Sequence, residues 1–180
     1  MRLFTPRLEL IRAWADPVRA AARDDRARLA ALLDADVPAD WPHEFLGDAL
    51  PHMADALERQ PPQDGYTMWF VVQREPRVLI GTAGLKSPPN DGRVDIGYGV
   101  VASFRRRGYA GEATRRLIDM AFEDPAVNRI VAETMPDLPA SIRVLEKCGF
   151  VQVAAGVTGF SGEEGVIQYE LKRPSTAPQR

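Results

Sequence analysis

The sequence predicts a single α+β domain (α/β in the broad sense) built on a mixed, mostly antiparallel twisted sheet that is flanked by helices. Three runs rich in β-branched and aromatic residues follow one another at 67–73, 77–85 and 94–101, joined by short polar turns, which is the pattern of an antiparallel meander. A helical segment then separates the third run from another apolar run at 129–134, and such a strand–helix–strand unit implies a parallel crossover. With 180 residues, 45% of them hydrophobic, the chain is long enough for one well-buried core.

Before the meander, the chain shows one strand and then helices. The period-2 segment 8–12 predicts a first strand. Asp16 followed by Pro17 is a good helix start, and apolar positions continue up to Asp34, either as one broken helix or as two short ones, the second of which Asp24 or Asp25 could cap. A further helical stretch at 43–60 is interrupted by Pro51 and ended by the Pro- and Gly-containing turn at 61–65.

After the meander, helices and strands alternate. Apolar residues at helical spacing predict a helix over 111–122, and the strand at 129–134 is followed by a helix that begins at Pro139 and ends at Gly149. The spacing predicts that Ala140, Val144, Leu145 and Cys148 face inward. Runs at 150–153 and 166–171 close the sheet as a hairpin. We therefore expect about seven strands with the fourth and fifth parallel and splayed, in one domain over 1–173 with a frayed tail at 174–180.

Composition restricts the class of protein. The net charge is −2 and the pI about 5.8, so there is no overall basic field to attract nucleic acid. No apolar run reaches the ~18 residues of a membrane span, and no secretory leader is recognisable, so we expect a cytoplasmic protein without a membrane partner. The single cysteine, Cys148, excludes an intrachain disulfide. His43 and His52 lack partners at ligand spacing, so no metal site is expected.

Positive charge is concentrated at one strand-to-helix junction. Arg105, Arg106 and Arg107 precede Gly108 and the start of the predicted helix, with Ala110 and Gly111 in its first turn. Free backbone N–H groups at a helix N-terminus attract anions, glycine permits close backbone approach, and arginine suits phosphate. The junction therefore predicts a phosphate-binding loop.

The pattern Arg105-x-x-Gly108-x-Ala110 resembles the (Gln/Arg)-x-x-Gly-x-(Gly/Ala) signature of the GNAT N-acetyltransferase superfamily. The order of predicted elements resembles the GNAT fold from Thr5 to Lys172. The segment 140–150, Ala-Ser-Ile-Arg-Val-Leu-Glu-Lys-Cys-Gly-Phe, resembles the fourth-helix motif of the ribosomal-protein N-acetyltransferase-like branch. Two motifs at the right separation support the same family.

The resemblance implies acetyl-CoA as co-substrate and an amine as acceptor. It places the pantetheine arm beside the backbone of Tyr98, Gly99 and Val100, with a main-chain N–H near Val100 as the donor to the thioester oxygen. The pyrophosphate would lie on the loop, and the start of the following helix would also be near the cofactor. These further cofactor-binding residues are Arg105, Arg106, Arg107, Gly108, Tyr109, Ala110, Gly111, Leu138 and Ser141.

The general base is less well defined by the resemblance. Glu133, at the end of a central strand, is the first candidate, and Asp95, on the fourth strand, is the second. Where many relatives have a cofactor-contacting Asn this chain has Leu138, and where several have a Tyr as general acid it has Leu145, which cannot donate a proton. Tyr98, Tyr109 or a water would then protonate the leaving thiolate, or no dedicated acid is needed.

Two other functions follow from the same features. A GNAT-fold module that binds coenzyme A without turnover would explain the two leucines, and a nucleic-acid or phosphoprotein binder would use the arginine cluster, against the acidic pI. Among acceptors, the ribosomal-protein branch suggests a protein N-terminus, but a small amine is equally compatible. The sequence leaves open whether the protein is a monomer or a homodimer.

Overall fold

An eight-stranded mixed sheet in the order β1-β2-β3-β4-β5-β6-β8-β7 runs through the computed structural model, which describes residues 1–44, 46–60, 65–160 and 162–174. The strands are β1 (Arg2–Phe4), β2 (Leu8–Arg12), β3 (Met68–Gln73), β4 (Val78–Leu85), β5 (Arg93–Val100), β6 (Arg129–Thr134), β7 (Val151–Val157) and β8 (Val166–Lys172). The helices are α1 (Ala15–Ala22), α2 (Arg26–Leu33), α3 (Leu50–Arg59), α4 (Tyr109–Glu123) and α5 (Pro139–Lys147), with short 3-10 turns η1 (Gly47–Ala49) and η2 (Ala102–Phe104).

The predicted fold class is confirmed, with one strand more than expected. Every neighbouring pair of strands is antiparallel except β5 and β6, which are parallel as predicted. The additional strand, β1, pairs Leu3 with Leu10 of β2 at the edge of the sheet. Three residues are too few to show a periodic pattern, so β1 is recognisable only from its pairing.

The parallel pair separates along its length. Pairing between β5 and β6 covers Arg93 to Asp95 opposite Arg129 to Val131 and then stops, although both strands continue. Beyond Asp95, β5 has a partner only on the side of β4. We call the opening between the second halves of β5 and β6 the gap.

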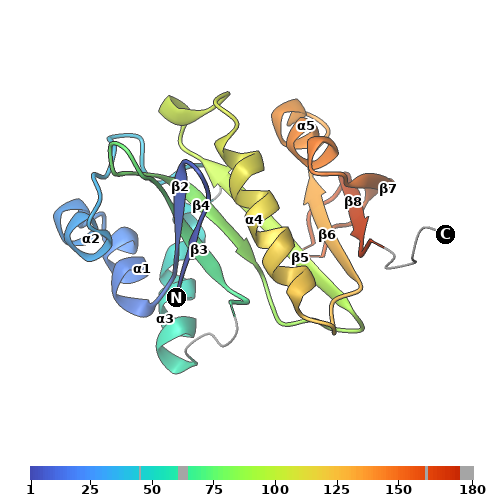
Figure 1. Ribbon diagram of the computed structural model, residues 1–180, viewed down its shortest axis with the longest axis horizontal. Coiled ribbons are helices and arrows are strands. Elements are labelled where there is room, and N and C mark those ends of the chain that lie inside the picture. Colours follow the sequence, from blue (N-terminus) through green and yellow to red (C-terminus); the bar gives the residue numbers. More distant parts are fainter. Residues whose placement is uncertain (45, 61–64, 161, 175–180) are drawn as a thin grey trace.

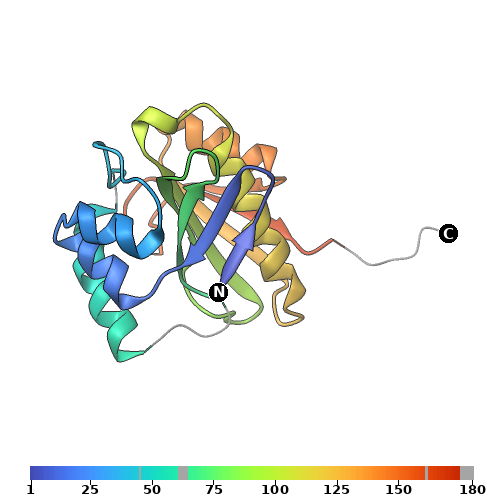
Figure 2. The same ribbon diagram turned by 60° about the vertical axis from the view of Figure 1, so that its left-hand side comes forward.

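Helices cover the two faces of the sheet unequally. In Figure 1, α4 crosses in front of the sheet with α5 beside it, and α1, α2 and α3 gather at the opposite end; Figure 2 shows the two helical layers on either side of the strands. One core cluster lies between the sheet and α4, around Trp69, Leu85 and Leu117. The other lies beneath α1, α2 and α3, around Phe70 and Leu33. The layer formed by α1, α2 and α3 covers only the first half of the sheet.

Local sequence signals set most helix ends. The Asp25 carboxylate accepts the amide of Arg28 at 3.0 Å and caps α2, which makes the segment after residue 15 two helices rather than one. Pro139 lies at the start of α5, and Gly149 follows its end with φ +89°. Pro51 does not interrupt a helix, as the sequence suggested, but lies in the first turn of α3, where its missing N–H is no loss.

One predicted core position is wrong. Ala140 is exposed, whereas Leu145 is buried and Val144 and Cys148 are partly buried. The reason is that α5 packs on the core through Ile142, Leu145 and Cys148, and Ala140 does not belong to that side of the helix. The turn expected at 61–64 and the tail from 175 onward lie outside the described residues. Among the helices that are described, none has both the length and the apolar character needed to cross a bilayer.

Candidate functional site

The register of β5 against β4 decides which of its main-chain groups face the gap. The Lys86 amide donates to Asp95 O at 2.8 Å and the Val101 amide donates to Ile80 O at 3.0 Å. Because main-chain groups alternate along an antiparallel strand, the odd-numbered residues of β5 direct their N–H and C=O at β4 and the even-numbered ones at the gap. Tyr98 and Val100 therefore offer backbone groups to the gap. Gly99, predicted together with them, faces β4 with its backbone.

The loop between β5 and α4 forms a cradle of backbone amides that is suited to an anion. After η2 the backbone turns through Arg106, with φ +61°, and Gly108, with φ +82°, into the first turn of α4. In the described part of the chain, the amides from Arg106 to Gly111 donate to no recorded acceptor, and α4 has no side-chain N-cap. A run of free N–H groups at the N-terminus of a long helix is suited to phosphate.

The three loop arginines have different roles. Arg105 Nε donates to Val100 O at 3.0 Å and its Nη2 pairs with Glu44 at 2.8 Å. Arg107 donates to Ser103 O and lies over the ring of Phe104. Arg106 is exposed and has no recorded partner among the described residues. Of the predicted cluster, Arg106 is thus the guanidinium that remains uncommitted for an anion.

A clamp from the N-terminal turn holds this loop, and sequence reasoning missed it. Glu112, in the first turn of α4, accepts from Thr5 Oγ1 at 2.5 Å, from Arg7 N at 3.0 Å and from Arg7 Nε at 2.7 Å. Arg7 also donates to Arg107 O and lies over the Tyr109 ring. Partial burial raises the pKa of Glu112, but the hydrogen bonds and the charge of Arg7 outweigh it and hold the pKa below its usual value.

Tyr98 links the gap to α5. Its hydroxyl donates to Ser141 O at 3.1 Å and lies 3.3 Å from Ser141 Oγ, while burial raises the pKa of Tyr98 to about 12. Leu138 is the N-cap residue of α5, and Leu145 is buried in the core. The other tyrosine considered as an acid, Tyr109, is committed, because its hydroxyl donates to Gln73 at 2.7 Å.

The two predicted carboxylates lie on the face of the sheet opposite α4, and both have partners. Asp95 pairs with Arg93 at 3.0 Å, and its side chain is 15% exposed. Glu133 accepts the amide of Phe160 at 3.0 Å and Gln168 Nε2 at 2.9 Å, which fixes the β7–β8 loop beside it. Arg93 stacks over the Phe160 ring at 4.1 Å. The structure therefore brings both carboxylates to the same surface.

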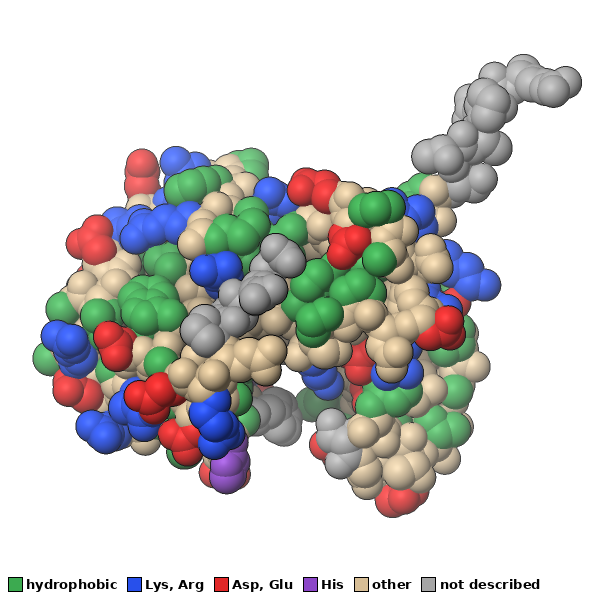
Figure 3. All heavy atoms as spheres, turned by 90° about the horizontal axis from the view of Figure 1, so that it is seen from below, with side chains coloured by type: hydrophobic (Ala, Val, Ile, Leu, Met, Phe, Trp, Pro, Cys, Tyr) green, Lys and Arg blue, Asp and Glu red, His purple; other side chains and the backbone are tan. Residues whose placement is uncertain are grey.

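This surface is hollowed. Seen from below, in Figure 3, the molecule divides into two lobes, and basic and acidic side chains lie where the lobes meet. Helices α1 to α3 belong to one side and the β7–β8 hairpin to the other, as in Figure 1. Over Gly97 of β5, the nearest atom to the position of a Cβ is Lys86 Cε, at 3.8 Å. The floor beside Asp95 is therefore open.

His43 is a second residue that sequence reasoning missed. It was considered only as a metal ligand, but the structure buries it against Gly99 of β5. Within the described ranges, no cluster of His, Cys, Asp and Glu is arranged to hold a metal ion. A buried histidine in a loop gives no periodic signal, so only the tertiary contact reveals it.

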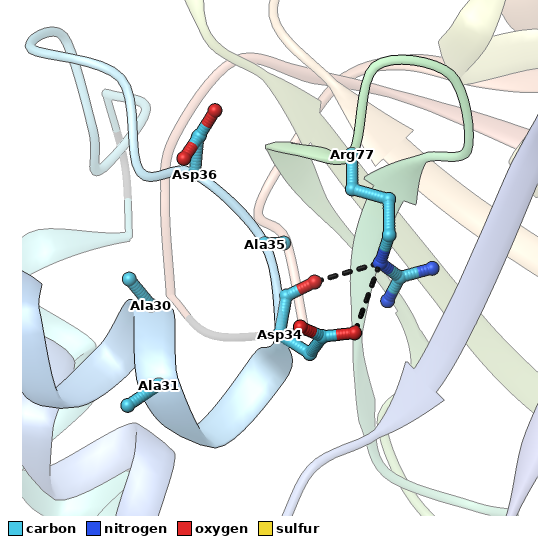
Figure 4. A pocket seen from close by; sticks show the side chains of 6 residues that line it. All are labelled: Ala30, Ala31, Asp34, Ala35, Asp36 and Arg77. Carbon is cyan, nitrogen blue, oxygen red and sulfur yellow. Dashed lines mark hydrogen bonds and ion pairs between the residues drawn. The ribbon is translucent and has the colours of Figure 1, made fainter.

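A surface pocket at the end of α2 is remote from this chemistry. It measures about 420 Å³ and is lined by small alanines of α2 together with Asp34, Asp36 and Arg77 (Figure 4). Arg77 donates to Asp34 O at 2.6 Å and pairs with the buried Glu9, so its charge is already neutralised. We interpret the pocket as a packing hollow at the end of α2.

Comparison with known proteins agrees with the geometry. A family model described as an acetyltransferase (GNAT) domain matches residues 17–151. The chain belongs to the GNAT acetyltransferase family. The enzyme class predicted from the loop motif, an N-acetyltransferase, is confirmed at this level. The uncharacterised N-acetyltransferase YjdG of Bacillus subtilis is 32% identical over 62% of this chain and 67% of its own length. Two further relatives from Bacillus are matched over less than half of their length.

Solved GNAT structures share the fold over the whole chain. A protein named as a ribosomal-protein-serine acetyltransferase from Vibrio cholerae has a TM-score of 0.70 at 19% identity, covering 96% of this chain and 98% of its own. The ribosomal-protein α-N-acetyltransferase RimL, solved in complex with coenzyme A, has a TM-score of 0.69 at 16% identity, covering 96% and 98%. At these identities the likeness concerns the fold alone.

Proposed function

We propose that this protein transfers the acetyl group of acetyl-CoA to a primary amine by direct attack of the amine on the thioester. The observation that carries the proposal is the run of amides from Arg106 to Gly111, which have no recorded acceptor among the described residues and follow a strand that directs the backbone of Tyr98 and the N–H of Val100 at the gap. Phosphate and a peptide-like arm are the two chemical features of coenzyme A that such groups recognise.

In this arrangement, the loop amides and Arg106 hold the pyrophosphate, and the backbone of Tyr98 and Val100 holds the pantetheine arm along the gap. Coenzyme A supplies an activated thioester. The Val100 N–H, directed at the gap, is the donor available to the thioester oxygen as negative charge develops there. Gly99 contributes through its missing side chain rather than through its backbone groups.

The amine enters from the hollowed surface, where Glu133 and Asp95 lie. We propose Glu133 as the group that takes up the amine proton, directly or through a water, because it belongs to the strand that borders the gap. Asp95 remains the second candidate, because it lies at the closed end of the gap and its charge is paired with Arg93. The leaving thiolate would take its proton from the Tyr98 hydroxyl or from a water, because the Tyr109 hydroxyl already donates to Gln73.

The acceptor is proposed to be either a protein N-terminus or a small amine. Relatives in structure include an α-N-protein acetyltransferase and a spermidine N-acetyltransferase, which supports both classes. An acetylation screen with tripeptides bearing different N-terminal residues and with polyamines separates the two, with release of coenzyme A thiol as the readout.

The cofactor assignment is tested by calorimetric titration with acetyl-CoA and with acetyl-pantetheine, which lacks the pyrophosphate. We expect acetyl-CoA to bind at micromolar concentration and acetyl-pantetheine at least tenfold more weakly. Each charge-assisted hydrogen bond to the loop contributes about 1.5–3 kcal/mol. Equal affinity for the two would contradict the loop as pyrophosphate site, and no binding of acetyl-CoA at millimolar concentration would contradict the function itself.

A coenzyme A-binding module without turnover is the second candidate. The buried Leu145 and the apolar Leu138 favour it, because neither side chain can donate a proton. Binding of acetyl-CoA without thiol release for any amine in the screen would decide for this module.

A further inference from the structure

His43 is buried against the part of β5 that faces the reaction. Its side chain belongs to a residue only 8% exposed, in the loop between α2 and η1. A Cβ added at Gly99 would overlap three atoms of the imidazole ring, so the ring lies directly on the backbone of Gly99. Trp41 packs edge-on against the other side of the ring, with ring centroids 6.4 Å apart.

Both ring nitrogens have partners. Nδ1 lies 2.6 Å from the carbonyl oxygen of Glu44, and Nε2 lies 2.8 Å from Oγ1 of Thr82, a residue 5% exposed. A carbonyl only accepts, so Nδ1 carries the proton and Nε2 accepts from the Thr82 hydroxyl. Because Thr82 is the β4 partner of Gly99, the imidazole is bonded to one strand while it packs on the next.

The same loop also reaches the cofactor side. The Glu44 carboxylate pairs with Arg105, which in turn donates to Val100 O. Three residues before His43 in the same loop, Asp40 accepts the amide of Ser103 at 2.8 Å and the Ser103 hydroxyl at 3.0 Å. The loop that contains His43 thus holds the residues on both sides of the Gly99–Val100 peptide: the imidazole packs on Gly99, and Arg105, paired with Glu44, holds the carbonyl of Val100.

We propose that His43 is a positioning residue for acetyl transfer: its imidazole fixes the Gly99–Val100 peptide, whose N–H faces the gap where the thioester oxygen must bind. This inference rests on the proposed function. If the Val100 N–H is displaced, it stabilises the negative charge that develops on the thioester oxygen less well. A displacement of about 1 Å in a catalytic site lowers the rate on the order of a hundredfold. His43 acts through the β5 backbone and does not itself touch the reacting atoms.

The positioning requires the neutral imidazole. Burial lowers the pKa of His43, and the nearby charge of Arg105 lowers it further. The hydrogen bond to Glu44 O and the Glu44 carboxylate act in the opposite direction, but burial is the largest effect. Those two side chains are the charged groups acting on the ring, since Thr82, Gly99 and Trp41 carry no charge. Protonation would turn Nε2 into a donor facing the Thr82 hydroxyl and add a cation near Arg105.

The test uses a signal that needs no acceptor. Binding of acetyl-CoA labelled with ¹³C at the thioester carbonyl is followed by difference infrared spectroscopy, because a hydrogen bond from Val100 N–H lowers the carbonyl frequency. We expect a clear downshift in the wild-type protein, and loss of at least half of it in His43→Phe, with the dissociation constant of acetyl-CoA changed less than threefold. In the wild type the shift should also diminish in acid, at a pH below the ordinary histidine pKa of about 6.5, because burial lowers the pKa of His43 in the folded protein.

Matched variants separate positioning from general damage. His52→Gln replaces the exposed histidine of α3 and should leave the shift and its pH dependence unchanged. His43→Gln keeps a donor and an acceptor and should retain more of the shift than His43→Phe, without the acid dependence. Gly99→Ala should reduce both the shift and the unfolding free energy because its Cβ meets the ring, and His43→Ala in the same chain should recover the stability, since it makes room for that Cβ, without recovering the shift.

An unchanged carbonyl shift in His43→Phe, with acetyl-CoA bound, would overturn the inference. If His43→Phe fails to fold, Thr82→Val removes the Nε2 partner while leaving the ring in place, and an unchanged shift there has the same meaning. Absence of acetyl-CoA binding in the wild type is a different result, which contradicts the proposed function and with it the inference.

Discussion

Glu133 and Asp95 show how a carboxylate becomes a candidate base only through its surroundings. Both lie on the hollowed surface, but Asp95 is paired with Arg93, whereas Glu133 is held by neutral donors, the Phe160 amide and Gln168. A carboxylate without a cationic partner keeps its capacity to take up a proton better than one in an ion pair. Glu133 is therefore the stronger candidate at the residue scale.

Glu133→Gln tests this assignment. We expect kcat for acetyl transfer to fall about a hundredfold or more, as for loss of a general base, with the affinity for acetyl-CoA unchanged. The control is Glu170→Gln, which removes a carboxylate of β8 that pairs with Arg129 and Lys172. A kcat within threefold of the wild type in Glu133→Gln would contradict the role, and Asp95→Asn would then be examined in the same assay.

Because Glu133 also anchors the β7–β8 loop, its replacement has a second effect. The Phe160 amide now donates to both oxygens of the Glu133 carboxylate. The side chain of Gln would offer it only one oxygen. Thermal unfolding of the variant measures this structural effect separately, so that a loss of rate is not confused with a loss of fold.

At the scale of elements, the phosphate loop depends on a partner far away in sequence. Thr5 and Arg7, in the turn between β1 and β2, hold Glu112 and therefore the first turn of α4. These contacts stabilise a loop with two residues in the left-handed region, Arg106 and Gly108. Under the proposed function, a loop that is held in this way before phosphate arrives would bind it at a lower entropy cost.

Glu112→Ala removes the acceptor of the clamp. We expect the free energy of unfolding to fall by about 2 kcal/mol, the scale of a charge-assisted hydrogen-bond set that is partly exposed, together with weaker binding of acetyl-CoA. Denaturant unfolding and calorimetric titration measure the two effects. The control is Glu123→Ala at the exposed end of the same helix, which should change neither. Unaltered affinity in Glu112→Ala would show that the loop keeps its shape without the clamp.

At the scale of the whole molecule, the uneven cover of the sheet creates the site. Helices α1 to α3 and the loop that carries His43 cover the face opposite α4 only as far as Gly99 of β5, so the surface over Gly97 remains open on that side. The sheet separates at the same place. Donor and acceptor can therefore approach the gap from opposite faces, which matches a direct transfer between them.

The fold as a whole should lose stability in mild acid. The pKa of His43 is lowered by burial, and the pKa of Asp40 by its hydrogen bonds from Ser103. In the folded protein, His43 and Asp40 each bind a proton less readily than in the unfolded chain. The stability that each group contributes is therefore fully present above its pKa in the unfolded chain, and it is lost as the pH falls through its lower pKa in the folded protein. For His43 the loss begins near pH 6.5, and for Asp40 near pH 4.

Denaturant unfolding of the wild type and of His43→Gln between pH 4 and pH 8 checks this. The difference in unfolding free energy between the two should shrink as the pH falls below about 6.5, because the variant lacks the titrating ring. His52→Gln, whose ring is exposed, should run parallel to the wild type over the whole range. A constant difference between His43→Gln and the wild type would contradict the contribution of His43.

Much of the fold and the cofactor half of the site follow from local sequence. The run Arg105 to Gly111 predicts an anion site by itself, since glycine, arginine and a helix start act over a few residues, and the alternation of strands and helices predicts the parallel pair. Cap residues such as Asp25 and Pro139 set helix ends in the same local way.

The tertiary structure alone decided the rest, because those features depend on residues far apart in the chain. Register against β4 directs the backbone of Tyr98 and Val100, rather than Gly99, at the gap. Burial turns His43 from an isolated loop residue into a support for β5, and a contact across about a hundred residues makes Glu112 a clamp. Local chemistry therefore determined which ligand we propose for this protein, and long-range packing determined how the proposed binding groups are held.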